Sequence, residues 1–171
     1  TYRAPDREQK AREWQQAFSK DGLEVDLVCM DISDPDNCQS AANEIMDRYG
    51  KLDILVNNGG ITRDSVMKKM SLKQWQDVIH TNLDSVFNVT HCFLQKMLDN
   101  GYGRIINISS IATDMVMAVP EEVREKIRAG IPVGRFGKPE EIARVIAFLA
   151  DENSGFITGA DFSVNGGMHM H

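Results

Sequence analysis

The sequence is poor in cysteine and has no long apolar run, and both shortages exclude classes of protein. Its three cysteines are an odd number and form no C-x-x-C pair, which argues against a disulfide framework or a zinc knuckle. No metal site is predicted, because the four histidines are not spaced with acids or thiols as ligands would be. No run of about 18 apolar residues occurs, so we expect no membrane-spanning helix. A cytoplasmic protein fits these features best.

Positive charge is also scarce. The formal net charge is -6 and the isoelectric point is near 5.2, which leaves no electrostatic reason to bind nucleic acid or an anionic membrane surface. Neither is expected as a partner. With 171 residues, of which 42% are hydrophobic, we expect one domain that covers residues 1–171.

Apolar periodicity predicts helices and strands in alternation. The predicted helices are 6–20, 37–50, 71–100, 120–129 and 139–150. The predicted strands are 23–33, 52–56, 104–109 and 161–164, and the continuous apolar run 52–56 predicts burial on both faces. This order is typical of a parallel α/β sheet with helices on both faces. Four strands are nevertheless fewer than the roughly six of an open doubly wound nucleotide-binding sheet.

Several motifs carry a family likeness: DILVNNGGITRD, HTNLDSVFNVT, GRIINISS, IATDM and GFITGADFSVNGG. Together they resemble the short-chain dehydrogenase/reductase family, in particular its beta-ketoacyl reductases, over nearly the whole chain from about Val25 onward. The resemblance implies a Rossmann-like doubly wound parallel sheet flanked by helices, seen here incomplete.

The same resemblance implies an activity. The expected reaction is reduction of acetoacetyl-CoA to 3-hydroxybutyryl-CoA by NADPH, and reduction of a 3-oxoacyl-acyl-carrier-protein is the alternative. NADP is preferred over NAD, because Arg3 and Arg7 follow the expected end of the second strand and no acid precedes Asp6. A homotetramer is implied, with helix 71–100 as a contact face, although the apolar stripe of that helix could equally face the sheet.

Residue roles follow from the resemblance as well. Asn82 and Ser110 are the expected catalytic residues: the Asn82 amide can perturb its helix and hold a water, and the Ser110 hydroxyl would bond the substrate carbonyl. Asp64 is expected to contact the thioester. The plain structural alternatives are turns at 31–34 and 57–60, a helix kink at Asn82 and a loop cap at Ser110. The expected cofactor-binding residues are Asp31, Ile32, Asn57, Asn58, Gly59, Gly60, Ile61, Thr62, Ile111 and Thr113, where Gly59 replaces the family's alanine.

Two motifs of the family are missing. Its proton donor is a tyrosine with a lysine four residues on, whereas Tyr2, Tyr49 and Tyr102 are followed at that spacing by Asp6, Asp53 and Ile106. The 13 glycines also contain no G-x-x-x-G-x-G phosphate loop. Because parallel strands need a crossover between them, we expect missing segments before Thr1 and between Ser110 and Ile111. The alternative is an inactive family member that acts as a binding or assembly subunit.

Overall fold

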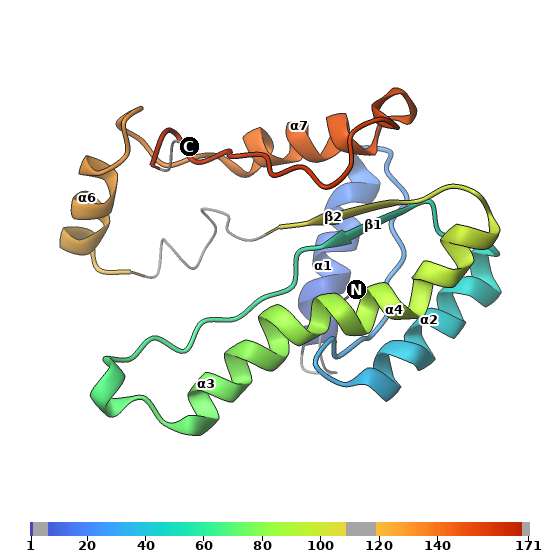
Figure 1. Ribbon diagram of the computed structural model, residues 1–171, viewed down its shortest axis with the longest axis horizontal. Coiled ribbons are helices and arrows are strands. Elements are labelled where there is room, and N and C mark those ends of the chain that lie inside the picture. Colours follow the sequence, from blue (N-terminus) through green and yellow to red (C-terminus); the bar gives the residue numbers. More distant parts are fainter. Residues whose placement is uncertain (2–6, 109–118, 169–171) are drawn as a thin grey trace. The chain divides into compact units, whose positions relative to one another are not determined.

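The chain divides into two compact units, Thr1–Asn107 and Ile108–His171. The computed structural model describes residues 1, 7–108 and 119–168, and the rest of the chain lies outside the described part. The first unit opens with helix α1 (Glu8–Lys20), which confirms the predicted helix and starts two residues later (Figure 1).

A pair of parallel strands forms the sheet of the first unit. Strand β1 (Ile54–Asn57) pairs with β2 (Arg104–Asn107) in a register that sets Asn57 opposite Asn107. Both strands were predicted. Burial on both faces was not confirmed for β1, since Leu55 is buried whereas Ile54 and Val56 are 39% and 38% exposed. The buried Leu55 belongs to the core cluster, and α4 (Ser85–Asp99) packs on β1, whereas the side chains of Ile54 and Val56 point to the opposite face of the strand.

Two further predicted strands are corrected by the structure. Residues 23–33 carry only an isolated bridge at Cys29 and end in a turn at 32–33, and residues 161–164 are not assigned to a strand. A strand requires a neighbouring ladder of hydrogen bonds, and the described strands pair with each other instead. The apolar pattern still predicted burial in the first segment, because Val28 and Met30 lie in the core.

Helix α2 (Pro35–Tyr49) has bounds that its local sequence explains. The Asp34 side chain accepts hydrogen bonds from two backbone N–H groups of the first turn, at 3.0 and 3.3 Å. Pro35 occupies the first helical position, where a missing N–H costs no helical bond. Gly50 ends the helix at a φ of 73°, in the left-handed region that suits glycine. The predicted helix is confirmed and begins two residues earlier.

The predicted helix 71–100 is a continuous helical rod with a change of winding in its middle (Figure 1). It consists of α3 (Leu72–Ile79), the π-helical turn η3 (His80–Asp84) and α4. Ser71 and Gln74 form the predicted capping box at its start. A short 3-10 turn, η2 (Met67–Lys69), precedes it. No helix within the described residues is both long and apolar enough to cross a bilayer.

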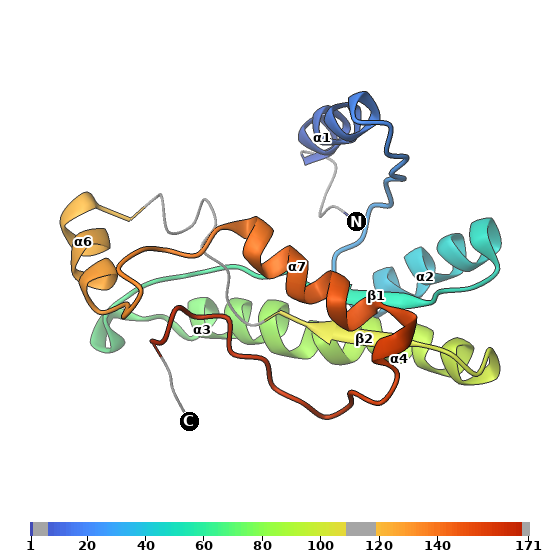
Figure 2. The ribbon, with the colours of Figure 1, turned by 90° about the horizontal axis from the view of Figure 1, so that it is seen from above.

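The core of the first unit lies where α2 and α4 pack together and α4 meets β1 (Figure 2). Phe93 is its largest fully enclosed side chain and is 2% exposed. The other members of this cluster are Val28, Met30, Cys38, Ala41, Ala42, Leu55, Val89 and Met97. The core therefore joins residues that are far apart in the sequence.

The second unit contains the two predicted helices of the C-terminal region, α6 (Glu121–Ala129) and α7 (Pro139–Ala150), followed by the 3-10 turn η4 (Glu152–Ser154). The backbone N–H of Val133 donates to the carbonyl of Gly166 at 3.2 Å. A Cβ on Gly166 would lie 2.8 Å from the side chains of Ile131 and Val133, so glycine permits this close approach.

A charged clamp holds the start of α7. Both guanidinium NH groups of Arg135 donate to the Glu141 carboxylate at 2.7 Å, and the backbone N–H of Lys138 donates to it at 2.8 Å. These contacts, led by the Arg135 hydrogen bonds, lower the pKa of Glu141 from 4.5 to about 2. Because the folded pKa is depressed, the clamp's stabilisation is complete above about pH 4.5 and is lost as the pH falls toward about 2.

We expect Arg135→Gln to raise the pKa of Glu141 toward 4.5, because the carboxylate loses its main charged donor. Titration of the Glu141 side-chain carboxyl carbon by NMR measures this. Arg144→Gln is the matched control and should move the pKa less, since the Arg144 charge is the weakest of the contributors. An unchanged Glu141 pKa in Arg135→Gln contradicts the clamp.

Candidate active site

The predicted site residues that the structure describes all lie in the first unit. They come from the turn that precedes α2, from the end of β1 at Asn57, from the loop 58–64 after β1, and from η3. Asp64 is exposed in that loop, and its substrate contact stays a prediction. Ser110, Ile111 and Thr113 lie outside the described residues. Of these segments, the loop 58–64 directly follows a strand, at the edge of the sheet where the fold class places ligands.

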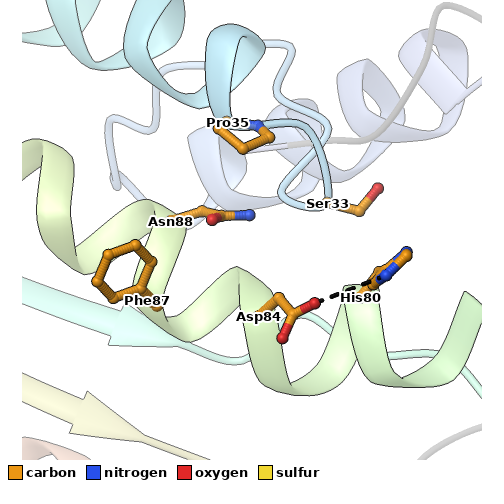
Figure 3. A pocket seen from close by; sticks show the side chains of 6 residues that line it. All are labelled: Ser33, Pro35, His80, Asp84, Phe87 and Asn88. Carbon is orange, nitrogen blue, oxygen red and sulfur yellow. Dashed lines mark ion pairs between the residues drawn. The ribbon is translucent and has the colours of Figure 1, made fainter. Parts of the chain in front are cut away.

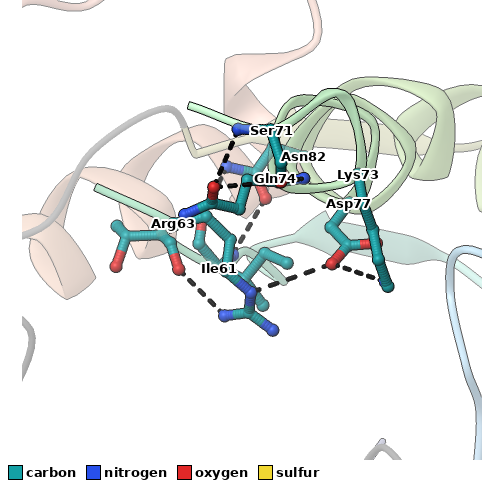
Figure 4. A network of polar contacts seen from close by, with 8 residues as sticks. Ile61, Arg63, Ser71, Lys73, Gln74, Asp77 and Asn82 are labelled. Carbon is teal, nitrogen blue, oxygen red and sulfur yellow. Dashed lines mark hydrogen bonds and ion pairs between the residues drawn. The ribbon is translucent and has the colours of Figure 1, made fainter. Parts of the chain in front are cut away.

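Asn82 and Ile61 are held together by two hydrogen bonds (Figure 4). The Ile61 N–H donates to Asn82 Oδ1 at 2.8 Å, and Asn82 Nδ2 donates to the Ile61 carbonyl at 2.9 Å. The side-chain amide thus pairs with the loop backbone as a neighbouring strand would. The π-helical turn around Asn82 confirms that the helix is perturbed at this residue, and such turns are frequent at functional sites.

This pairing changes the interpretation of Asn82. Both polar atoms of its side chain serve the Ile61 backbone, so its observed task is to position the loop after β1. An amide oxygen and nitrogen each have a second hydrogen-bonding position, and a bound water would use one of those. The predicted role in a proton relay stays a prediction.

Asn57 joins the carboxyl ends of the two strands. Its Nδ2 donates to Asn107 Oδ1 at 2.9 Å and to Thr90 Oγ1 at 3.2 Å. An amide nitrogen carries two hydrogens, and both are used here. Asn57 was predicted to contact the cofactor; the structure gives its amide nitrogen a scaffolding task in addition.

The turn at Asp31 is tied to two helices. Asp31 Oδ1 accepts from the backbone N–H of Ser33 at 3.0 Å and from its hydroxyl at 2.6 Å. Its own N–H donates to Asn37 Oδ1 on α2 at 2.6 Å, and Asn88 of α4 donates to the Ile32 carbonyl at 3.2 Å. The backbone that presents Asp31 and Ile32 is therefore fixed from both sides.

The buried Cys38 contacts the backbone of the same turn. Its thiol lies 3.6 Å from the carbonyl oxygens of both Asp31 and Ile32 and donates toward them. Burial, and then the nearby Cys92 and the carboxylates of Asp34 and Asp31, raise the pKa of Cys38 to about 11. The thiol is accordingly protonated at neutral pH and packs the turn rather than acting as a nucleophile.

Five of the residues predicted to bind the cofactor lie in these two segments, the turn at Asp31 and the loop after β1. Asp31 offers a carboxylate, Ile32 an apolar surface, and Asn58, Gly59 and Gly60 an exposed turn beside them. A Cβ on Gly59 would lie 2.3 Å from Ile32 Cδ1, so the two segments touch. This donor set fits the adenosine half of a nicotinamide cofactor.

Two hollows lie beside this turn along the helical rod. The larger, about 380 Å³, is shown in Figure 3 and is lined by Ser33, Pro35, His80, Asp84, Phe87 and Asn88. The smaller, about 220 Å³, is lined by Ser33, Ile61, Arg63, Lys73, Asp77, His80 and Thr81. Ser33 and His80 line both, so the hollows adjoin.

Sequence reasoning considered Arg63 as a contact of the thioester but missed four other charged or titratable side chains of these hollows, which are Lys73, Asp77, His80 and Asp84. Asp77 pairs with Lys73 at 2.8 Å and lies 3.9 Å from Arg63, which brings the loop after β1 to the surface of α3 (Figure 4). His80 lies 3.8 Å from Asp84 in the next turn (Figure 3). The i, i+4 spacing of Lys73 with Asp77 and of His80 with Asp84 was the available signal, but it did not say what these pairs face.

Comparisons with known proteins identify the family and several relatives. The family model described as short chain dehydrogenase matches residues 3–121, and the model described as enoyl-(acyl carrier protein) reductase matches residues 110–169. The chain is 37% identical over 206 residues to an acetoacetyl-CoA reductase of Allochromatium vinosum, covering 94% of this chain and 84% of that protein.

Two other relatives extend the comparison. An acetoacetyl-CoA reductase of Cupriavidus necator is 41% identical over 184 residues, which cover 81% of this chain and 75% of the relative. A 3-oxoacyl-[acyl-carrier-protein] reductase of Escherichia coli is 32% identical over 188 residues, with coverages of 84% and 77%. The matched span of 206 residues exceeds the 171 residues of this chain, so the Allochromatium protein has residues within that span that have no counterpart here.

Proposed function

Since this chain belongs to the short-chain dehydrogenase family, we propose that it reduces acetoacetyl-CoA to 3-hydroxybutyryl-CoA with NADPH. Membership confirms the predicted family and Rossmann-like fold class and makes the chain an NAD(P)H-dependent oxidoreductase. The observation that carries the proposal is the likeness to reductases of 3-keto thioesters, at 32–41% identity over most of the chain. The proposal also chooses CoA over acyl carrier protein as the thiol of the substrate, and NADP over NAD as the cofactor.

The residues of this chain have distinct tasks in the proposed reaction. A bound nicotinamide cofactor supplies the hydride for the 3-keto carbon. Asp31 and Ile32 hold its adenosine half, and Asn82 keeps the Ile61 backbone in place beside it. Ser110 positions the carbonyl oxygen and stabilises the alkoxide by a hydrogen bond.

The proposed reaction also needs a proton donor for the alkoxide oxygen. Tyr2 lies outside the described residues; of the other two tyrosines, Tyr49 donates a hydrogen bond to Asp26, which raises its pKa, whereas a catalytic tyrosine needs a lowered pKa. The Tyr102 ring lies 4.7 Å from the guanidinium of Arg104, beside the start of β2. We therefore place the donor on a segment between Ser110 and Ile111, a proposal supported by the longer matched span of the relatives.

A paired assay tests the proposed substrate. Oxidation of NADPH, followed by its absorbance, is measured with acetoacetyl-CoA and with acetoacetyl-acyl-carrier-protein, and each is repeated with NADH. We expect the highest kcat/KM with acetoacetyl-CoA and NADPH. Faster turnover of the carrier-protein thioester would move the assignment to the alternative reductase, and no turnover of either thioester would defeat both.

A second candidate is an inactive binding or assembly subunit, which the missing Tyr-x-x-x-Lys motif favours. The intact mass of the protein isolated from its native host separates the two. A mass near 19.2 kDa together with absent turnover supports the inactive subunit. A larger mass with turnover supports the reductase.

The proposed assembly is a homotetramer in the cytoplasm. The rod formed by α3, η3 and α4 exposes large apolar side chains, which a second copy would bury. They are Leu72, Trp75, Leu83, Phe87, Leu94 and Leu98, each between 41% and 70% exposed. A native mass of four protomers is expected, and a monomer would contradict it. The three cysteines, all in the described part, are free thiols, which suits a reducing compartment.

A further inference from the structure

Gly59 has no backbone reason to be glycine. The glycines with positive φ in the described residues are Gly22, Gly50, Gly101, Gly134, Gly159, Gly166 and Gly167. Gly59 is not among them, so an alanine at this position would adopt the observed backbone without strain. The need for glycine must come from a neighbouring atom.

That neighbouring atom belongs to Ile32. A Cβ built on Gly59 would lie 2.3 Å from Ile32 Cδ1 and 3.7 Å from its Cγ1. The first distance is far inside van der Waals contact, so the end of the isoleucine side chain occupies the space that a methyl at position 59 would need. The absence of a side chain at Gly59 therefore leaves the space that the end of the Ile32 side chain fills.

Ile32 has little freedom to move inward. Its side chain packs against the core cluster of the first unit, and its carbonyl accepts from Asn88 Nδ2 and from the Cys38 thiol. The interior is close-packed, so a methyl at position 59 would push the end of the side chain toward the exposed side of the turn. That side adjoins Asp31, where a ligand would approach.

We infer that Gly59 and Ile32 are a coupled pair of positioning residues, in which the missing methyl of Gly59 lets Ile32 form the apolar wall for a bound adenosine group. This inference rests on the proposed function, because it takes the ligand to be the adenosine half of the nicotinamide cofactor. The pair sets affinity through the shape of the wall, and neither residue takes part in the hydride transfer.

A double-mutant cycle tests the coupling, with NADPH binding measured by fluorescence titration of the purified protein without thioester. Gly59→Ala is expected to raise the Kd for NADPH about tenfold, which lies within the range of interaction energies measured between contacting residues. Ile32→Val removes Cδ1, so the double variant Gly59→Ala with Ile32→Val should return to within about threefold of the wild-type Kd. Thermal unfolding of the ligand-free proteins is recorded in parallel and should show the same loss and recovery.

Gly60→Ala shows whether the rescue is specific. A Cβ on Gly60 would lie 3.5 Å from Asn82 Oδ1, which is an ordinary contact, and no atom of Ile32 is near it. If Gly60→Ala changes the Kd for NADPH, adding Ile32→Val should not return that Kd to the wild-type value. A wild-type Kd in Gly59→Ala, or a weakened Kd that Ile32→Val fails to restore, overturns the coupling. If the wild-type protein binds neither NADPH nor NADH, the proposed function fails, and the inference fails with it.

Discussion

Replacing Asn82 with alanine is expected to lower kcat/KM for the thioester about 100-fold, because small misplacements of positioning groups have costs of this order. The substitution removes both hydrogen bonds that hold the Ile61 backbone, at 2.8 and 2.9 Å. The loop that follows β1, which carries residues predicted to bind the cofactor, then loses these two links to η3. Steady-state kinetics with varied NADPH and varied thioester measure the effect.

The choice of variants separates positioning from general damage. Asn82→Asp keeps an acceptor for the Ile61 N–H but turns an oxygen toward the Ile61 carbonyl, so we expect most of the loss to remain. Asn43→Ala is the matched control: this exposed asparagine of α2 accepts a hydrogen bond from Gln39 and should leave the kinetics unchanged. A kcat/KM within about threefold of wild type in Asn82→Ala would refute the positioning role.

Replacing Phe93 with alanine is expected to lower the free energy of unfolding by about 3–5 kcal/mol, since it removes a fully buried aromatic ring and leaves a cavity. Phe93 is 2% exposed in the core between α2, α4 and β1. Native domains are stable by only about 5–15 kcal/mol, so this variant should lose much of its stability. Urea unfolding monitored by circular dichroism measures the change.

Phe156 is the control for this prediction, because its side chain is fully exposed and it is not part of the rod proposed as a subunit contact. Phe156→Ala should therefore cost well under about 1 kcal/mol. Equal losses in the two variants would show that the core does not lie where the structure places it.

Helices were predictable from the sequence because their determinants are local. Asp34, Pro35 and Gly50 define the two ends of α2 within one short segment, and Ser71 with Gln74 begins the long rod. Strands were predictable only where a partner exists. Residues 23–33 and 161–164 carry strand-like patterns, but pairing depends on distant segments, and among the described residues β1 and β2 form the paired strands.

For the candidate site, too, the sequence predicted some residues but not the contacts between them. The motifs identified Asp31, Ile32 and Asn82 as residues of interest, and the structure describes all three near the loop after β1. Their partners were not predictable: nothing in the sequence pairs Asn82 with the Ile61 backbone or places Ile32 against Gly59. The polar side chains His80 and Asp77 were missed for the same reason.

The sequence by itself determined the family and the positions of the helices and their caps, because these depend on residue type and short spacing. Only the tertiary structure decided that the Asn82 side chain hydrogen-bonds to the backbone of Ile61 and that the missing side chain of Gly59 leaves space for Ile32. Each of those contacts joins residues more than 20 positions apart, and the distance between such residues is set by how the chain packs.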